Sequence, residues 1–422
     1  MQNRLPNTRH VRRHALAAWL MGVALAAGAA QPSPHWVASW GAAQQIPEPH
    51  NELAPQYWRD ATLRQIMHTS LGGERLRVRV SNVFGTEPLT VGAAGIALAG
   101  APGDAAIDAA STRTLTFDGR ANVTIPAGGE YYSDPVALPH KAGADLAISL
   151  HFKDAPARQT GHPGSRATSF VGSGNQVAAA TLDEPTKVEH WYALADVEVQ
   201  AARGTHAVVA IGDSITDGNG ATTDGNNRWP DLLAARLRTA KAPMGVVNAG
   251  IGGGRMLRDG LGPNLVSRFE RDVLGRAGVS HVIVMIGVND LGGLHRNKPD
   301  DPAARAQMLD DLRLAHRQLV ERAHAQGVCV IGGTITPYTR SDYYKPGPDN
   351  EADRQAYNRW IRQSGTFDGV ADFDALLRDP ARPDYLLKAY DNDGLHPSIE
   401  GYRKMADAVP LDALKTCAYA KH

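Results

Sequence analysis

The sequence has little of what a metalloprotein or a nucleic-acid-binding protein needs. It contains only two cysteines in 422 residues, and no Cys/His spacing is typical of a metal site. Charge of either sign is not in excess, because Lys+Arg and Asp+Glu are both 44. A net charge of zero argues against nucleic acid or an anionic membrane surface as the main partner, since both require a basic field. We therefore expect no metal, no other cofactor and no nucleic-acid partner.

A long hydrophobic run is also lacking at the N-terminus. The apolar run 15–27 follows several arginines and precedes the small residues 28–30. This order is typical of a secretory signal peptide. A retained anchor fits less well because the run is short, and Arg12 with Arg13 fits a twin-arginine signal only weakly. The sequence predicts a signal peptide over residues 1–30, a periplasmic or secreted protein, and no integral membrane segment after cleavage.

The two cysteines, Cys329 and Cys417, allow two interpretations. Export would permit a disulfide between them. Cys329, however, lies within an apolar run that is typical of a strand, where a thiol behaves as a small buried hydrophobic group. The sequence leaves their pairing open.

The chain is too long for one ordinary domain, and its pattern changes near residue 204. Segments such as 75–81 and 146–152 alternate apolar and polar residues, with Gly, Pro and Asp turns between the strands. No convincing amphipathic helix occurs there. This pattern predicts a β-sandwich-like accessory domain over residues 36–203. Because no low-complexity linker follows it, we expect it to pack closely against the second domain, at 205–416.

The second half alternates strands and helices. Apolar runs predict strands at 207–211, 245–249, 281–287, 328–335 and 369–371. Amphipathic patterns and capping residues predict helices at 229–240, 264–276, 301–326, 351–364 and 399–414. Five strands that alternate with helices indicate an α/β fold with a parallel sheet covered on both faces.

The strand at 207–211 ends at Gly212, Asp213 and Ser214. Its uninterrupted apolar residues are typical of a strand buried on both faces. A serine that follows a central strand lies where open α/β sheets place their ligand chemistry. Taken alone, the Gly-Asp-Ser segment is better explained as an ordinary turn with a helix cap.

Three further segments supply what a serine nucleophile needs. Residues 248–254 form a glycine-rich loop whose N–H groups can approach a ligand closely. Asn289 follows the third strand, and Asp393 precedes His396 by three residues. Ester cleavage requires a nucleophile with a base, an orienting partner for that base, and donors for the developing oxyanion. Each residue alone has an ordinary structural explanation, but their order at successive strand ends predicts a catalytic site.

These segments resemble the four signature blocks of the SGNH hydrolases, also called GDSL-type esterases and lipases. Residues 212–214 are similar to the nucleophile block and 248–253 to the glycine block. Residues 287–290 are similar to the Gly-x-Asn-Asp block and 393–396 to the Asp-x-x-His block. Some secreted bacterial members also look similar at the opening segment 36–41.

The resemblance implies a role for each matching residue. It implies Ser214 as nucleophile, His396 as base and Asp393 as the partner of His396. It implies oxyanion donors on Ser214, Gly253 and Asn289, with the glycine assignment open by one residue. It also implies a flavodoxin-like three-layer α/β/α domain with the strand order 2-1-3-4-5.

Two aspartates beside these residues are expected to be structural. Asp213 is expected to cap the turn after the first strand, because the Asp-x-x-His spacing lets Asp393 reach His396. Asp290 is expected to brace Asn289. Because Ser214 does not lie in a Gly-x-Ser-x-Gly motif, the nucleophile elbow of the α/β-hydrolases is not indicated.

The substrate is less well defined. Tyr338, Tyr343 and Tyr344 lie in a loop after the fourth strand, where they would stack on a sugar or pack within the protein. We predict Tyr338 and Arg255 as substrate contacts, with Arg255 and the two residues after it bordering an acyl pocket. No long apolar lid segment is present, which weakens the interpretation as a true lipase.

The sequence therefore predicts a serine esterase that forms an acyl-enzyme. Its substrate is expected to be a short acyl or acetyl ester, on a carbohydrate or a lipid. An acyltransferase or a lipase or phospholipase would use the same residues, and a catalytically inert carbohydrate-binding protein is the alternative from another class.

Overall fold

A computed structural model describes residues 35–297 and 301–420, and the signal peptide predicted at 1–30 lies outside them. From His35 onward the chain forms one compact unit. We call residues 35–203 the β-region and residues 205–420 the α/β region. None of the helices in this part of the chain combines the length and the apolar character that crossing a bilayer requires.

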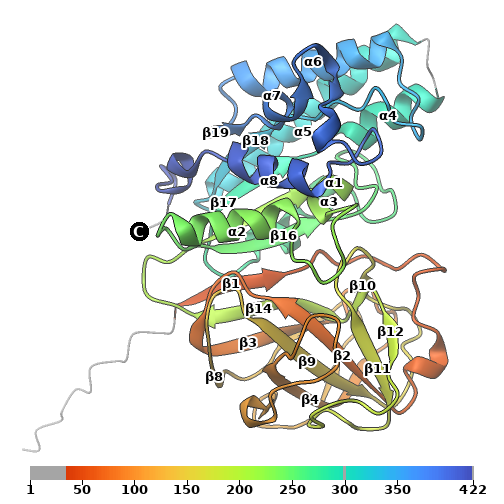
Figure 1. Cartoon of the computed structure of the whole chain (residues 1–422), viewed down its shortest axis with the longest axis vertical. Coiled ribbons are helices and arrows are strands. Elements are labelled where there is room, and N and C mark those ends of the chain that lie inside the picture. The colour runs from red at the N-terminus through yellow and green to blue at the C-terminus, as the bar shows by residue number, and fades with distance from the viewer. Residues whose placement is uncertain (1–34, 298–300, 421–422) are drawn as a thin grey trace, which may run out of the picture. The chain divides into compact units, whose positions relative to one another are not determined.

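The α/β region is built on a five-stranded parallel sheet (Figure 1). Its strands are β15 (Ala207–Gly212), β16 (Gly245–Gly250), β17 (Val279–Met285), β18 (Cys329–Gly333) and β19 (Gly369–Ala371). They are arranged in the order β16-β15-β17-β18-β19. This is the 2-1-3-4-5 order of the flavodoxin-like fold, so the predicted fold class is confirmed.

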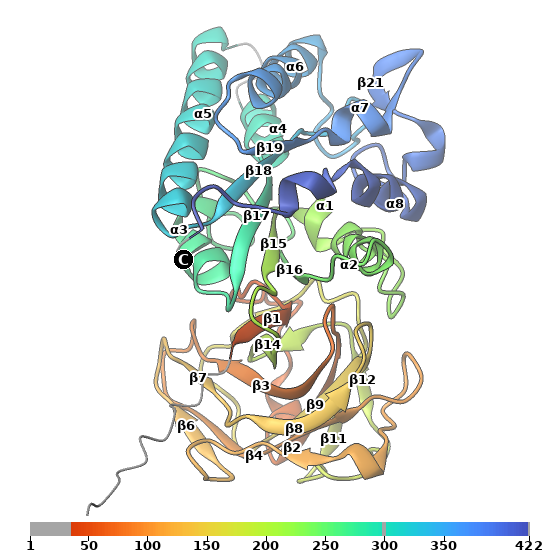
Figure 2. The same cartoon turned by 90° about the vertical axis from the view of Figure 1, so that its left-hand side faces the viewer.

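Alternate residues of β15 face two different helical layers, as the period of a strand requires. Val208 and Ala210 belong to a buried cluster with residues of α2 (Trp229–Thr239), α7 (Phe373–Leu377) and α8 (Ile399–Ala408). Val209 and Ile211 belong to another, with residues of α3 (Leu265–Phe269), α5 (Pro302–Ala325) and α6 (Pro348–Gln363). Figure 2 shows these layers on opposite sides of the sheet, with α4 (Val288–Asn297) beside α5 and α6.

The helix boundaries follow local capping. The Asp301 carboxylate accepts a hydrogen bond from Ala304 N–H and begins α5, as predicted. Helix α6 begins three residues before the predicted position, because Pro348 takes the first helical position and Asn350 accepts the Gly347 N–H. Helix α8 ends before Pro410, which has no N–H to continue it.

Several elements were not expected from the sequence. Helices α4 and α7 are additional, and the predicted helix at 264–276 is α3 followed by a π-helical segment, Glu270–Leu274. The segment Leu411–Leu414 is a 3-10 helix. A small hairpin of β20 (Arg378–Asp379) and β21 (Arg382–Leu386) precedes α8.

The β-region contains two larger antiparallel sheets. One consists of β1 (Trp36–Gly41), β14 (Leu194–Gln200), β3 (Gly73–Ser81), β7 (Glu130–Tyr132) and β8 (Val136–His140). The other consists of β12 (Thr186–Val188), β11 (Ser169–Ser173), β2 (Ala61–His68), β9 (Asp145–Phe152), β4 (Leu89–Leu98), β5 (Arg113–Thr114) and β6 (Val123–Ile125). Val78 of β3 and Ile148 of β9 share one buried apolar cluster, so the sheets enclose a sandwich-like core. A short pair, β10 (Gly161–His162) with β13 (Trp191–Tyr192), completes the region.

Strand β1 of the β-region covers the edge of the parallel sheet. The Val246 N–H of β16 donates to Ser70 Oγ at 2.8 Å. A Cβ atom on Gly245 would overlap the carbonyl oxygen of Ala38, so the two backbones are in direct contact. The edge strand β16 is therefore not open to pairing with another chain.

Buried arginines join the two regions further along this boundary. Arg276 of the α/β region donates to the carbonyl oxygens of Ala42 and Ala195, at 3.1 and 2.7 Å, and to the Asp196 carboxylate at 3.1 Å. Arg276 and Asp196 are both almost fully buried. A guanidinium supplies five donors, so one side chain can satisfy several acceptors from the β-region.

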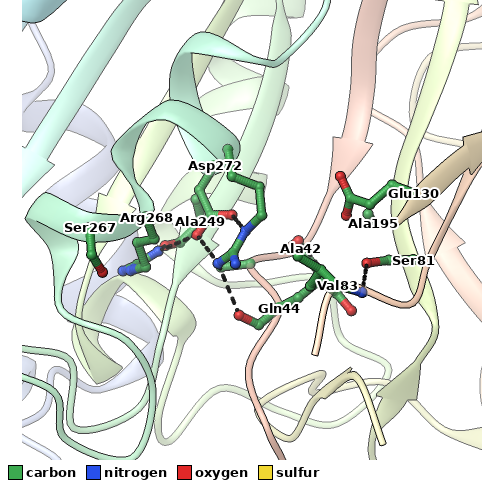
Figure 3. Close-up of polar contacts among 12 residues, drawn as sticks. Ala42, Gln44, Ser81, Val83, Glu130, Ala195, Ala249, Ser267, Arg268 and Asp272 are labelled. Atoms are coloured by element: carbon green, nitrogen blue, oxygen red, sulfur yellow. Dashed lines mark hydrogen bonds and ion pairs between the residues drawn. The ribbon is translucent and has the colours of Figure 1, made fainter. Parts of the chain in front are cut away.

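Asp272 is the centre of the same network (Figure 3). Its carboxylate accepts hydrogen bonds from Arg268 at 3.0 Å and from Arg271 at 2.8 Å. Arg271 also donates to the carbonyl oxygen of Gln44 in the β-region at 3.2 Å. Burial disfavours the charged carboxylate, but Arg271 and Arg268 outweigh it and lower the pKa of Asp272.

Cys329 and Cys417 form a disulfide. It connects the start of β18 with the segment that follows residues 411–414. The pairing that the sequence leaves open is therefore present.

Candidate active site

Ser214 is the first residue of α1 (Ser214–Asp217), a single helical turn that directly follows β15. The Asp213 carboxylate accepts the Ile215 N–H at 3.0 Å, so Asp213 caps this turn as predicted. Gly218 ends it with a left-handed φ of 101° and donates its N–H to the Ser214 carbonyl. The first N–H groups of a helix have no intrahelical acceptor, which leaves that of Ser214 for a ligand.

His396 connects Ser214 with Asp393. Its Nε2 lies 2.8 Å from Ser214 Oγ, and its Nδ1 lies 2.8 Å from Asp393 Oδ2. An ionised carboxylate only accepts hydrogen bonds, so Nδ1 carries the proton and Nε2 is free to accept the serine proton. The structure thus brings these three predicted residues together in one hydrogen-bonded chain.

The turn that carries the histidine is fixed by its own aspartate. Asp393 Oδ1 accepts the N–H groups of Leu395 and His396, at 3.0 and 2.7 Å. Burial favours protonated Asp393, but the hydrogen bonds from the ring and the backbone of His396 lower its pKa to about 2. The carboxylate is therefore ionised throughout the neutral and mildly acidic range.

Asn289, the second residue of α4, is oriented by two partners. Its Nδ2 donates to the carbonyl oxygen of Gly254 at 2.7 Å, and its Oδ1 accepts the Tyr344 hydroxyl proton at 2.5 Å. A carbonyl oxygen cannot donate, so the amide nitrogen must face Gly254 and the tyrosine must be the donor. Burial raises the pKa of Tyr344, which keeps this donor protonated. The sequence placed Tyr344 in a loop near the site but gave no sign of this contact.

The glycine loop after β16 carries the predicted oxyanion donor, which the sequence assigned to Gly253 with an uncertainty of one residue. Gly254 donates its N–H to the Ile251 carbonyl at 2.9 Å, so that N–H is already engaged. Within the described residues, neither Gly252 nor Gly253 donates its N–H, and both line the cavity beside Ser214. Gly253 has a φ of 64°, in the left-handed region that glycine adopts readily.

The prediction that Asp290 braces Asn289 is wrong, because Asp290 braces the glycine loop instead. Its carboxylate accepts the N–H groups of Met256 and Leu257, at 2.9 and 3.2 Å. Burial raises its pKa, although both of these hydrogen bonds lower it. The side chain leaves α4 toward the glycine loop, so it fixes the segment that carries Gly252 and Gly253.

Arg268 anchors two strand ends at once, and the sequence did not identify it. It donates to the carbonyl oxygens of Gly212 at 2.9 Å and Ala249 at 2.7 Å. These carbonyls precede the Ser214 turn and the glycine loop. Figure 3 shows Arg268 beside Asp272 and Ala249, so the anchor belongs to the network shared with the β-region.

Asp213 has an unusual electrostatic position. Its Oδ2 is buried and has no hydrogen-bond partner. Burial raises its pKa to about 7, against the opposing effects of the Ile215 N–H and His396. The carboxyl group beside Ser214 is thus close to the point where its charge changes at neutral pH.

A cavity of about 770 Å³ opens at these residues. Its lining includes the Ser214, Asn289 and His396 side chains, together with polar, aromatic and apolar neighbours: Asn219, Arg255, Asp259, Leu261, Asp342, Tyr343 and Tyr344. A molecule bound there would reach the serine hydroxyl, the glycine loop and Asn289 together. Among the described residues, no group of histidine, cysteine or carboxylate side chains is arranged to hold a metal ion.

Of the two predicted substrate contacts, Arg255 and Tyr338, only Arg255 lies at the cavity. Arg255 lines the cavity, whereas Tyr338 is 1% exposed and packs in the core. Met256 is also fully buried, and Leu261 takes the apolar position at the cavity. Tyr343, 64% exposed, is the tyrosine that presents its ring to solvent at the rim. The sequence of the loop does not reveal which of its three tyrosines is exposed and which two are buried.

Most of the α/β region matches a known protein family. Residues 210–404 match the GDSL-like lipase/acylhydrolase family. A search of curated proteins finds no match.

Solved structures with similarity to the chain include three enzymes. A GDSL-like lipase from Bacteroides thetaiotaomicron is 19% identical, with 51% of this chain and 92% of that chain covered and a TM-score of 0.38. An α/β hydrolase from the Lake Arreo metagenome is 22% identical, with 51% and 97% covered and a TM-score of 0.37. A variant of an acetyl xylan esterase from Geobacillus stearothermophilus is 23% identical, with 48% and 92% covered and a TM-score of 0.36.

Proposed function

We propose that this protein is an exported serine esterase with Ser214, His396 and Asp393 as its triad. The match of residues 210–404 to the GDSL-like lipase/acylhydrolase family, a family of carboxylic ester hydrolases, supports this proposal. The single observation that carries this proposal is the hydrogen-bonded chain from Ser214 Oγ through His396 to Asp393. The signal-peptide pattern at residues 1–30 and the Cys329–Cys417 disulfide support export to an oxidising compartment.

In the proposed reaction, Ser214 Oγ attacks the ester carbonyl while His396 Nε2 takes its proton. Asp393 holds the Nδ1 proton and stabilises the imidazolium that forms. When the carbonyl re-forms, the alcohol leaves with the proton from Nε2, and the acyl group remains on Ser214. A water molecule then attacks the acyl-enzyme, with His396 first as base and then as acid, and releases the carboxylic acid.

The negative charge on the carbonyl oxygen is proposed to meet donors already in place. These are the N–H of Ser214, an N–H of Gly253 or its neighbour Gly252, and the second Nδ2 proton of Asn289. The first Nδ2 proton is committed to the Gly254 carbonyl, and the Tyr344 hydroxyl holds Oδ1 away from the donors. Donors fixed before the reaction lower the barrier because no reorganisation is needed.

The cavity lining favours a short acyl group on a polar alcohol. Asn219, Asp259 and Asp342 offer hydrogen-bonding groups, and exposed Tyr343 offers a ring for stacking on a sugar. The apolar lining is limited to Leu261, Leu395 and the tyrosines. Acetylated carbohydrate is therefore our preferred substrate class over long-chain lipid.

The first test is Ser214→Ala, assayed on p-nitrophenyl acetate. We expect kcat to fall by roughly ten-thousandfold or more, because the triad acts as a unit. Ser173→Ala, at an exposed serine of β11 in the β-region, is the control and should keep full activity. An active Ser214→Ala variant with native melting behaviour would rule out the proposed nucleophile.

The substrate class needs a separate assay. A p-nitrophenyl ester series from acetate to decanoate should show kcat/KM highest for the shortest chains. Acetate release from an acetylated polysaccharide should have a higher KM in Tyr343→Ala, while hydrolysis of p-nitrophenyl acetate stays unchanged. A preference for decanoate would instead favour the lipase interpretation.

A further inference from the structure

One ionisable side chain of the β-region reaches the helix that carries Ser214. His162, at the end of β10, places Nε2 at 2.9 Å from Oδ1 of Asp217. Asp217 is the last residue of α1, three positions after Ser214. Both side chains are about 95% buried, at 4% and 5% exposed, so solvent does not compete for this contact.

Contacts with its surroundings must decide where α1 lies. A single turn of four residues does not gain enough hydrogen bonds to be stable by itself. A Cβ on Gly250 of β16 would overlap the backbone of Asp217, and a Cβ on Gly164 of the β-region would overlap its carboxylate. The turn is therefore held between the parallel sheet on one side and the loop after β10 on the other.

The hydrogen bonds of His162 require two protons. Its Nδ1 lies 2.8 Å from the carbonyl oxygen of Ala43, which only accepts, so Nδ1 carries a proton. Its Nε2 faces a carboxylate, and a hydrogen bond there needs a proton on the ring or on Asp217. With either arrangement the ring is tethered at both nitrogens, one to the β-region backbone and one to α1.

Neighbouring rings and charges fix the histidine itself. Its ring stacks on Trp191 with centroids 5.7 Å apart and an interplanar angle of 26°. The Arg228 guanidinium lies 5.6 Å from the Trp191 ring and is paired with Asp231 at 2.7 Å. A histidine immobilised in this way can transmit the position of the β-region to Asp217.

We propose that His162 is a positioning residue for the nucleophile: through Asp217 it fixes α1 and thereby Ser214 Oγ. The β-region is then a component of the catalytic apparatus and not only an accessory domain. This inference rests on the proposed role of Ser214. Because a small displacement of the attacking atom lowers the rate more than it lowers substrate affinity, the effect belongs in kcat.

Two substitutions separate the two hydrogen bonds of the ring. In His162→Asn the amide nitrogen takes the place of Nδ1, which keeps the Ala43 contact and loses Asp217. In His162→Gln the amide nitrogen takes the place of Nε2 and can still donate to Asp217. With p-nitrophenyl acetate we expect His162→Asn to lower kcat by about tenfold or more with KM within roughly twofold. His162→Gln should recover most of this loss.

Two further variants test the same contact: His190→Asn is the matched control, and Asp217→Ala removes the contact from its other side. His190→Asn changes a histidine of the same region whose Nδ1 lies 2.7 Å from the Pro163 carbonyl oxygen, and it should leave kcat unchanged. If His162→Asn melts below the assay temperature, Asp217→Ala removes the same contact from the other side and should show the same loss in kcat. The rate at which an organophosphonate labels Ser214 should fall in parallel, since labelling needs the nucleophile but no turnover.

The outcomes are distinct. Wild-type kcat and labelling rate in His162→Asn or Asp217→Ala would overturn the positioning role, as would equal losses in the Asn and Gln variants. Activity that survives in Ser214→Ala would instead overturn the proposed function.

Discussion

The parallel sheet of the α/β region and the antiparallel sheets of the β-region place their polar side chains differently. All six residues of β15 are buried and none carries a charge, and the polar residues begin only where the strand ends. In the β-region, Arg79, Asp196 and Glu198 lie within β3 and β14 and are nonetheless buried. The parallel sheet is covered by helices on both faces. The β-region instead packs partly against polar side chains of the α/β region, and there Arg276 pairs with Asp196.

This difference separates two uses of polar groups. At the strand ends of the α/β region they line the cavity, as Ser214 and Asn289 do. Along the boundary between the regions they are paired with one another, as in Arg276 with Asp196 at 3.1 Å. Buried charges are costly unless paired and hydrogen-bonded, so the boundary network binds the two regions to one another.

The largest expected effect comes from breaking that network. Asp272→Ala would leave Arg268 and Arg271 without their shared carboxylate, and we expect the free energy of unfolding to fall by roughly 3–5 kcal/mol. Asp310→Ala, at an exposed ion pair with Arg313 on α5, should cost less than about 1 kcal/mol. Urea unfolding followed by circular dichroism and by tryptophan fluorescence measures both variants. Separate transitions for the two regions of the wild-type chain would show that the network does not unite them.

The proposed chemistry at the strand ends is tested most directly at Asn289, the proposed oxyanion donor. Asn289→Ala should lower kcat by roughly a hundredfold to a thousandfold, equivalent to about 3–4 kcal/mol of transition-state stabilisation. Its KM should change little, because the bond forms with the charge that develops in the transition state. Steady-state kinetics on p-nitrophenyl acetate gives both parameters. Unchanged kcat would exclude the Asn289 side chain from the oxyanion site.

The buried histidine His316, which has no carboxylate partner among the described residues, should make the free energy of unfolding depend on pH. His316 lies among the rings of Tyr357, Trp360 and Phe367, and burial lowers its pKa to about 4. Between this value and about 6.5 the unfolded chain binds more protons than the folded chain, so stability is lost as the pH falls through that range. The contribution is roughly 3 kcal/mol.

The measurement compares wild type with His316→Phe in urea unfolding at pH 7 and pH 4. The phenylalanine variant cannot take up the proton, so its free energy of unfolding should fall less between these two pH values. Equal pH dependence in both proteins would mean that His316 does not carry the effect.

The smallest effect is expected at Tyr344. Tyr344→Phe removes one hydrogen bond to Asn289 and should lower kcat by about fivefold, or roughly 1 kcal/mol. In the Asn289→Ala background the same substitution should have no further effect, because the amide that it orients is gone. Gly292→Ala is a second route, since its Cβ would lie 2.6 Å from the Tyr344 ring and displace it. Additive losses in the double variant would assign Tyr344 a separate role.

The residues that sequence could predict are those whose roles depend on local order. Alternating strands and helices predicted the parallel sheet, and the family resemblance implied its order. The Asp-x-x-His spacing let one carboxylate reach the imidazole within a single turn. Asp213 as a cap followed from its place after an apolar strand. These inferences succeeded because the interacting groups are close in sequence or lie at the same edge of the sheet.

Other contacts could not be predicted because their partners are far apart in the chain. Tyr344 and Asn289 are separated by 55 residues, and His162 and Asp217 also by 55. Tyr338 and Tyr344 look alike in the sequence and both are buried, yet only Tyr344 lines the cavity. Which of them meets the site depends on the path of a loop, which no periodicity encodes.

The sequence by itself therefore determined the fold class, the disposition of Ser214, Asn289, Asp393 and His396 around one edge of the sheet, and the cap at Asp213. The tertiary structure alone decided the Cys329–Cys417 pairing, the Tyr344 contact that orients the amide, and the His162 contact with the serine helix. The physical reason is range: backbone hydrogen bonding and hydrophobic periodicity act over a few residues, whereas these contacts arise only when separate elements pack against each other.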